Sequence, residues 1–149
     1  MQKSDSVDII TAHEATEFSQ ARSTVVIGGV ATNLIVPGLV LEAAVQIDSR
    51  HYLLFLTDDI IFEEWLTIVL LDIHHGVKET VRIGQAWASG YFENLSVKEE
   101  EITFRFLGDA KWRVKITLTP RLRFPFFSDP PAVHRAPGWK KHLTVDCVK

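Results

Sequence analysis

The sequence predicts a mainly antiparallel all-β domain, either a barrel or a two-layer sandwich of about eight strands, accompanied by a short N-terminal helix. Three observations point to this class. The chain has 149 residues, of which 46% are hydrophobic and 23% are charged, as in an ordinary globular domain. Its clearest hydrophobic pattern repeats every second residue, and its apolar runs are short and bounded by Gly or Pro. We therefore expect a single domain over residues 1–149.

The first 23 residues are polar, and residues 12–22 are expected to form the short helix, although few of them are apolar. The pattern changes after this segment. Two short apolar runs, at 25–30 and 34–36, are interrupted by Gly28 and Gly29 and followed by Pro37. Runs of this length are typical of buried strands.

A β-hairpin is expected between residues 39 and 56. Every second residue from 39 to 47 is apolar, so that one face of this strand carries Leu39, Leu41, Ala43, Val45 and Ile47. Residues 48–50 supply the turn and residues 51–56 the returning strand. The next segment, 57–65, begins with Thr and Asp residues that can cap a helix, which predicts one helical turn.

Further strands are expected along the middle of the chain. Residues 66–71 are apolar at every position, which predicts a strand buried on both sides, followed by a turn at 72–76. Residues 77–83 alternate again. They lead through a connection at 84–90 to a strand near 91–97.

The strongest alternation lies at residues 102–118 and predicts a hairpin with a three-residue loop at 108–110. This loop would place Phe106 opposite Trp112, Phe104 opposite Val114, and Ile102 opposite Ile116. The same register places Arg105 directly opposite Arg113 on the other face.

The pattern ends at Pro120. Residues 120–138 are rich in proline and are expected to wrap around the body as an extended segment, and residues 142–148 are expected to add an edge strand. No internal repeat or linker divides the chain. The predicted core consists of Leu41, Val45, Leu54, Leu56, Ile68, Leu70, Phe104, Phe106, Trp112, Val114 and Ile116.

The composition predicts a cytoplasmic protein that needs no cofactor. The one cysteine, Cys147, cannot form an intrachain disulfide or a thiolate zinc site. The first residues lack the pattern of a secretory signal. The most apolar stretch, 25–45, contains Asn33, Pro37 and Glu42, so core strands are expected there rather than a membrane span.

Charge is distributed unevenly along the chain. Residues 1–104 hold 16 acidic and 6 basic residues, whereas residues 105–149 hold 3 acidic and 10 basic residues. Such asymmetry can mark a surface for a charged partner, or two halves of one fold that neutralise each other. The sequence pI of about 6.0 and the lack of recognised motifs argue against nucleic acid as the partner.

Two charged clusters are candidate partner-binding surfaces. A basic stripe is expected on the outer face of the 102–118 hairpin, where it would bind a polyanion or an acidic protein, or be neutralised by Glu93, Glu101 or Glu42. An acidic cluster lies at 58–65 among apolar side chains, and either docks a basic partner or forms a solvated turn. Its spacing fits no calcium loop. The two surfaces comprise Arg105, Lys111, Arg113, Lys115, Asp58, Asp59, Glu63, Glu64 and Trp65.

Evidence for catalysis in the sequence is weak. His74 and His75 are adjacent and lack a third ligand at a diagnostic spacing, so no metal site is expected. Motifs for a nucleophilic serine, a phosphate-binding loop or a dinucleotide site are also missing.

The sequence therefore favours a non-catalytic interaction or accessory protein that binds another protein through its charged, aromatic-studded surfaces. Two alternatives remain open, and homo-oligomerisation is compatible with all three functions. One is a β-barrel that binds a small apolar or anionic ligand in its interior. The other is a small acid/base enzyme, in which His51, His74 or His75 would lie within hydrogen-bond reach of Asp58, Asp59 or Glu63.

Overall fold

The computed structural model describes residues 1–60, 64–85, 88, 90–122, 129–136, 138 and 140–148. Within these residues the chain is all-β, with thirteen strands in three antiparallel sheets and no helix. The six-stranded sheet comprises, in spatial order, β1 (Gln2–Lys3), β5 (Val40–Gln46), β6 (His51–Thr57), β7 (Leu66–Asp72), β8 (Gly76–Ile83) and β12 (Val133–Arg135). The four-stranded sheet comprises β13 (Lys140–Val148), β11 (Lys111–Leu122), β10 (Ile102–Arg105) and β9 (Glu93–Val97). The three-stranded sheet comprises β2 (Val7–His13), β3 (Arg22–Ile27) and β4 (Val30–Pro37).

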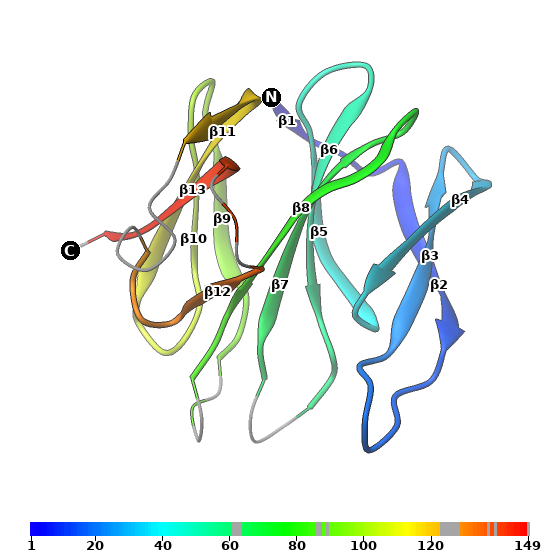
Figure 1. The fold of residues 1–149 in the computed structure, drawn as a ribbon, viewed down its shortest axis with the longest axis horizontal. Helices are drawn as coiled ribbons and strands as arrows, with labels where there is room; N and C mark the ends of the chain where they lie inside the picture. Colours follow the sequence, from blue (N-terminus) through cyan, green and yellow to red (C-terminus); the bar gives the residue numbers. More distant parts are fainter. Residues whose placement is uncertain are drawn as a thin grey trace.

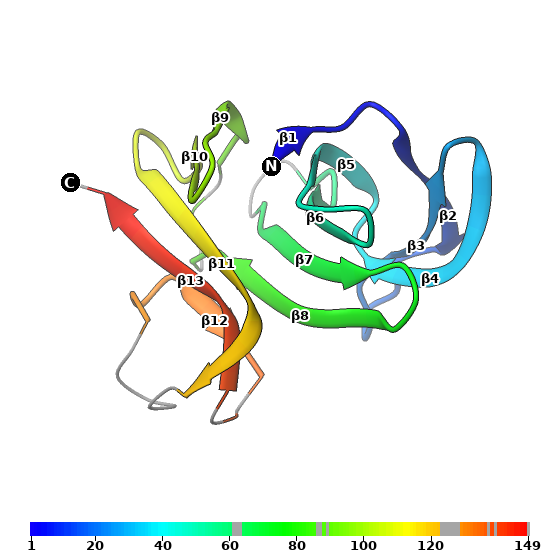
Figure 2. The ribbon, with the colours of Figure 1, turned by 90° about the horizontal axis from the view of Figure 1, so that it is seen from above.

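The three sheets are stacked as layers, with the six-stranded sheet in the middle (Figures 1 and 2). Two separate hydrophobic cores follow from this arrangement. The first lies between the central and four-stranded sheets, and the second between the central and three-stranded sheets. The sequence-based expectation of an antiparallel all-β fold is therefore confirmed, but the described residues form thirteen strands rather than about eight, and the sheets form neither a closed barrel nor a two-layer sandwich.

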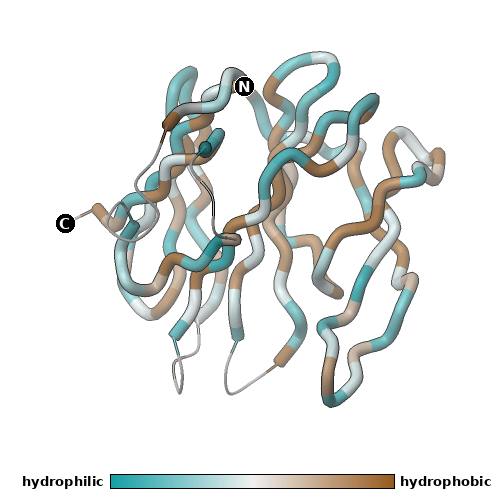
Figure 3. Tube along the Cα trace, viewed as in Figure 1, coloured by the Kyte–Doolittle hydropathy of each residue, from teal (hydrophilic) through white to brown (hydrophobic). Residues whose placement is uncertain are grey.

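The central strands explain the third layer. Every residue of β7 is buried, and β6 is buried from Tyr52 to Thr57. Leu53 and Leu70 belong to the first core, whereas Leu54 and Leu71 belong to the second. Strands that are apolar on both faces must be covered on both faces, because each exposed apolar side chain would forfeit the free energy of its burial. Hydrophobic stretches follow the strands, and hydrophilic ones gather at several hairpin ends (Figure 3).

The N-terminal helix expected at 12–22 is not formed. Residues up to His13 belong to β2, and Arg22 already begins β3. Between them, the Ser19 carbonyl accepts a hydrogen bond from the Thr16 amide. Few apolar side chains are present to pack a helix there, so pairing with β3 determines the local structure instead. The helical turn expected at 57–65 is absent from residues 58–60 and 64–65, and residues 61–63 lie outside the described residues.

The alternation predicted for 39–47 is broken by a β-bulge. The register of β5 against β6 shifts between Leu41 and Ala43. As a result, Leu41 packs on the second core, while Ala43, Val45 and Ile47 pack on the first. A bulge adds one residue to one strand and thereby moves the following side chains to the opposite face.

The hairpin predicted at 102–118 forms, but its register differs by two residues. Phe104 pairs with Trp112, and Ile102 with Val114. The loop is longer than expected because the Phe106 amide bonds to the Ala110 carbonyl at 3.1 Å, with Leu107 and Gly108 at positive φ. Since a shift of two residues preserves the faces, Phe104 and Trp112 remain in the core, as predicted.

The predicted core is mostly confirmed, although it is divided between the two cores. Leu41 and Ile116 are only partly buried, and the other nine members are buried. A polar link joins two of the layers: Glu79 of β8 accepts a hydrogen bond of 2.7 Å from the Leu143 amide of β13. Arg135, whose side chain is 4% exposed, lies 3.5 Å from Glu79 and donates to the Leu143 carbonyl.

The C-terminal part departs from the expectation of one extended segment over 120–138. Strand β11 continues to Leu122, and β12 pairs with β8 at the edge of the central sheet. Residues 123–128, 137 and 139 lie outside the described residues. In the described part of the chain, no helix has the length and apolar character needed to cross a membrane.

Candidate functional site

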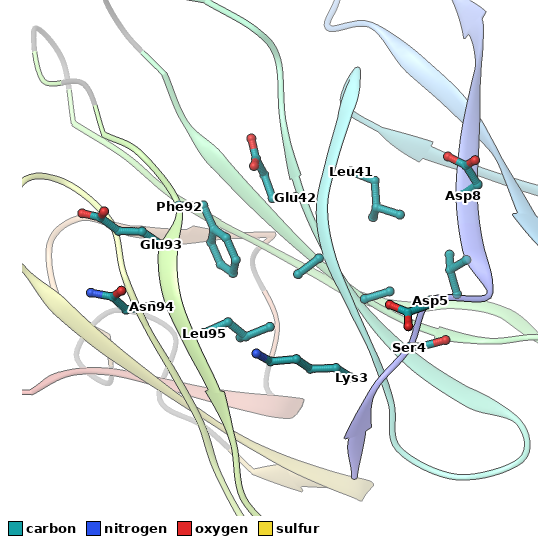
Figure 4. Close-up of a pocket in the computed structure, with 13 residues that line it drawn as sticks. Lys3, Ser4, Asp5, Asp8, Leu41, Glu42, Phe92, Glu93, Asn94 and Leu95 are labelled. Atoms are coloured by element: carbon teal, nitrogen blue, oxygen red, sulfur yellow. The ribbon is translucent and has the colours of Figure 1, made fainter.

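A groove of about 600 Å³ lies between two strand edges. One wall is formed by β5 and the other by β9 and the residue before it, Phe92. The end of β1, the segment that follows it and the start of β2 complete the lining (Figure 4). We call this hollow the acidic groove, after the charges of the side chains described below.

The short first strand creates the groove. Only Gln2 and Lys3 form β1, which pairs with Gln46 and Val45 of β5. The Ser4 amide adds one hydrogen bond of 2.9 Å to the Ala44 carbonyl, and the chain then passes to the three-stranded sheet. Among the described residues, therefore, Val40, Leu41 and Ala43 have a strand partner on the β6 side only, and Glu42, at the bulge, has none on either side.

The opposite wall is also an open edge. Strand β9 is the last strand of its sheet and pairs only with β10 in the described structure. Phe92 closes the groove at the core side, where its ring lies 5.0 Å from Phe55 and 5.2 Å from Phe104, measured between centroids. Two unpaired edges thus face a shared hollow with an apolar floor.

Among the described residues, four carboxylates and one ammonium group line the groove. Glu42 and Glu93 lie on the side of the four-stranded sheet, and Asp5 and Asp8 lie on the other side of β5 (Figure 4). Lys3 extends from β1 toward β9. An excess of one sign in a low-dielectric hollow attracts ligands of the opposite sign.

The predicted acidic cluster extends this groove. A second hollow of about 220 Å³ shares Glu42 and Phe92 with the groove and is also lined by Asp59, Glu64 and Tyr91. The Tyr91 side chain is 83% exposed, and the Thr57 hydroxyl donates a 2.7 Å hydrogen bond to Glu42. Glu42 of β5, together with Tyr91 and Phe92 before β9, therefore adds to the acidic and aromatic surface expected at residues 58–65.

Glu64 holds the loop that precedes it. Its carboxylate accepts hydrogen bonds from the Asp58 amide at 2.6 Å and the Ile60 amide at 2.7 Å. Burial raises the pKa of Glu64, and the nearby charges of Asp58 and Asp59 raise it further. The two amide hydrogen bonds lower the pKa, but the net shift is upward. The side chain therefore shapes the hollow rather than offering a free carboxylate to a partner.

Asp58 and Trp65 are not part of the lining of either hollow. Asp58 accepts hydrogen bonds of 2.9 Å from the Gln20 amide group. The centroid of the Trp65 ring lies 4.8 Å from the guanidinium carbon of Arg82 and 4.9 Å from the centroid of the His134 ring. A Cβ at Gly84 would collide with the Trp65 ring. Glu63 lies outside the described residues.

The basic stripe lies on the outer face of the four-stranded sheet, beside a hollow of about 310 Å³. The register places Arg105 opposite Lys111 rather than opposite Arg113, which corrects the expected pairing. Arg113 is 3.8 Å from Glu101 and 3.4 Å from Asp146, and Arg105 faces Glu93 on β9. Neighbouring carboxylates therefore offset part of the stripe, while Lys115 is exposed.

His51 and His75 both lie close to Asp72, away from the groove. His51 Nδ1 lies 2.9 Å from Asp48, and its Nε2 lies 3.4 Å from the buried Asp72. Asp72 also accepts hydrogen bonds from Arg50 and from the His74 amide. Within the described residues, the expected pairing of these histidines with Asp58 or Asp59 is not found, because Asp58 follows the opposite end of β6.

No group of three or more His, Cys, Asp or Glu side chains in the described chain is arranged to hold a metal ion. Comparison with protein-family models, with curated proteins and with solved structures finds no match. The groove geometry is therefore the basis for assigning a function.

Sequence reasoning missed most of the groove. Asp5 and Asp8 share one segment, Glu42 and Glu93 come from two others, and no diagnostic spacing links the three segments. The only available signal was the acidic excess of residues 1–104, which indicates the sign of a surface but not its position.

Proposed function

We propose that this chain is a non-catalytic binding protein whose acidic groove holds a basic segment of a partner protein. The observation that carries the proposal is the excess of four carboxylates over one ammonium group around the groove of about 600 Å³. Phe92 and Tyr91, next to these carboxylates, add apolar and cation–π contacts for lysine or arginine side chains. The single cysteine agrees with a cytoplasmic location, which we include in the proposal.

The two alternative functions have less support. The space between the layers is occupied by core side chains such as Phe104 and Trp112, and the sheets are not closed into a barrel that could hold a ligand. For the acid/base alternative, both ring nitrogens of His51 already face carboxylates, whereas a base needs a free nitrogen for its substrate.

The proposal is tested by fluorescence anisotropy with two labelled peptides, one repeating Lys-Lys-Val and one repeating Glu-Glu-Val. We expect the basic peptide to bind and its affinity to fall as the salt concentration rises from about 50 to about 300 mM, because screening weakens exposed charge pairs. We expect no binding of the acidic peptide. Preferential binding of the acidic peptide would contradict the proposal and favour the basic stripe.

Charge reversal locates the binding surface. The double variant Glu42→Lys, Glu93→Lys should weaken binding of the basic peptide by about tenfold or more, which corresponds to about 1.4 kcal/mol. The matched control is Glu99→Lys, Glu100→Lys, which makes the same change in net charge at two exposed residues outside the groove lining. Equal losses in both double variants would show a non-specific charge effect and reject the groove as the site.

A further inference from the structure

We infer that the partner segment binds as an added β-strand, pairing with the open edge of β5 in the place that β1 leaves empty. The occupant is an extended segment rich in lysine or arginine. This inference rests on the proposed function and specifies how the same groove recognises its partner.

Part of strand β5 has an unused hydrogen-bonding edge. Strand β5 pairs with β6 from Val40 to Gln46, but β1 covers only Val45 and Gln46 on the other side. After the bond between Ser4 and Ala44, the chain turns away, so the position beside residues 40–43 is not filled by any described strand. Backbone N–H and C=O groups at such an edge can pair with an incoming extended peptide.

The same edge of β5 selects against apolar strands. Glu42 lies at the bulge of β5, and both a bulge and a charged side chain discourage the addition of an arbitrary strand. A basic strand avoids part of this penalty because its side chains neutralise the carboxylate. The edge therefore disfavours apolar strands and accepts basic ones, and this difference makes the binding specific.

Carboxylates flank the empty strand position beside β5 on both sides. Successive side chains of a strand point to opposite faces of its sheet. On one face they would meet Glu42 and Glu93, and on the other Asp5 and Asp8 (Figure 4). The complementary segment therefore carries basic residues on both of its faces, unlike an amphipathic strand with one charged side.

The two walls have different roles in this arrangement. Strand β9 is also open, but Asn94, the second of its five residues, has a left-handed φ of 58°, which interrupts the extended edge. The β5 edge instead continues a line along which β1 already pairs. We therefore assign the added strand to β5, with Phe92 and Glu93 as the facing wall.

N-methylation of the peptide backbone tests the inference, because it removes the N–H donor and leaves the side chains in place. Two versions of the Lys-Lys-Val peptide are made, each methylated at one of the two alternating sets of residues. In strand addition only one set points its N–H groups at β5. We expect one version to bind about tenfold or more weakly than the unmodified peptide and the other to bind within about twofold of it.

The outcomes separate the inference from the proposed function. If both methylated versions bind as tightly as the parent peptide, the partner is held by side chains alone: strand addition is rejected and the proposed function stands. If the parent peptide itself does not bind, both are rejected. Amide hydrogen exchange identifies the edge: slowed exchange in residues 40–44 on peptide binding supports the assignment, and slowed exchange confined to β9 overturns it.

Discussion

Two buried carboxylates in this protein have opposite electrostatic environments. Burial alone would raise the pKa of Asp72, but hydrogen bonds from the His74 amide, Arg50 and His75 lower it well below its usual range. At Glu64 the balance is reversed, and burial together with neighbouring carboxylates raises the pKa. Asp72 therefore stabilises the fold as an anion, whereas the negative charge of Glu64 is held at an energetic cost.

This difference predicts the pH dependence of the Asp72→Asn variant. Because the folded-state pKa of Asp72 is lowered, its ionised form contributes stability above the ordinary pKa of about 3.9, and this contribution is lost as the pH falls through the folded-state value. We expect the variant to melt at a lower temperature than the wild type at about pH 7. The difference between the two melting temperatures, the gap, should narrow below about pH 4. Thermal melts followed by circular dichroism measure both. The exposed Asp109→Asn serves as the control, and a gap that stays constant with pH would contradict the role of Asp72.

The central strands carry the clearest consequence of the layered fold. Leu70 and Leu71 are adjacent on β7 and both fully buried, yet they face different cores. In a two-layer sandwich, one of two adjacent side chains would face solvent. In three layers, both contribute their full burial to stability.

Leu70→Ala and Leu71→Ala should therefore each lower the free energy of unfolding by about 2–5 kcal/mol. Urea denaturation measures the effect. Val77→Ala, at a residue that is 43% exposed on the neighbouring strand, should cost less than about 1 kcal/mol. A near-neutral result for either leucine would show that one face of β7 is not covered, against the three-layer arrangement.

Local patterns predicted the elements of this fold better than their assembly. The alternation at 102–118 identified the hairpin and its buried face, but not its register, because Leu107 and Gly108 adopt positive φ in a longer loop. Likewise the alternation at 39–47 identified a strand but could not show the bulge at Glu42, which depends on pairing with β6. Residues 66–71 indicated burial on both sides, although no local signal shows which segment supplies the second cover.

At the scale of the whole molecule, the uneven charge of the sequence becomes two surfaces on different sheets. Four acidic residues of the first part of the chain line the groove beside β5, and the basic stripe lies on the outer face of the four-stranded sheet. Ion pairs of Arg113 with Glu101 and Asp146 reduce the positive charge of the basic stripe. Among the described residues that line the groove, only Lys3 offsets the four carboxylates. The sequence predicted the two kinds of surface, but not the groove, since its walls come together only when three sheets stack.

The most direct test of the central claim is a crystal structure of the protein with the Lys-Lys-Val peptide. We expect an extended peptide backbone beside residues 40–43 of β5, with basic side chains near Glu42 and Glu93 on one face and near Asp5 and Asp8 on the other. A peptide bound on the outer face of the four-stranded sheet, or away from the acidic groove, would contradict the claim.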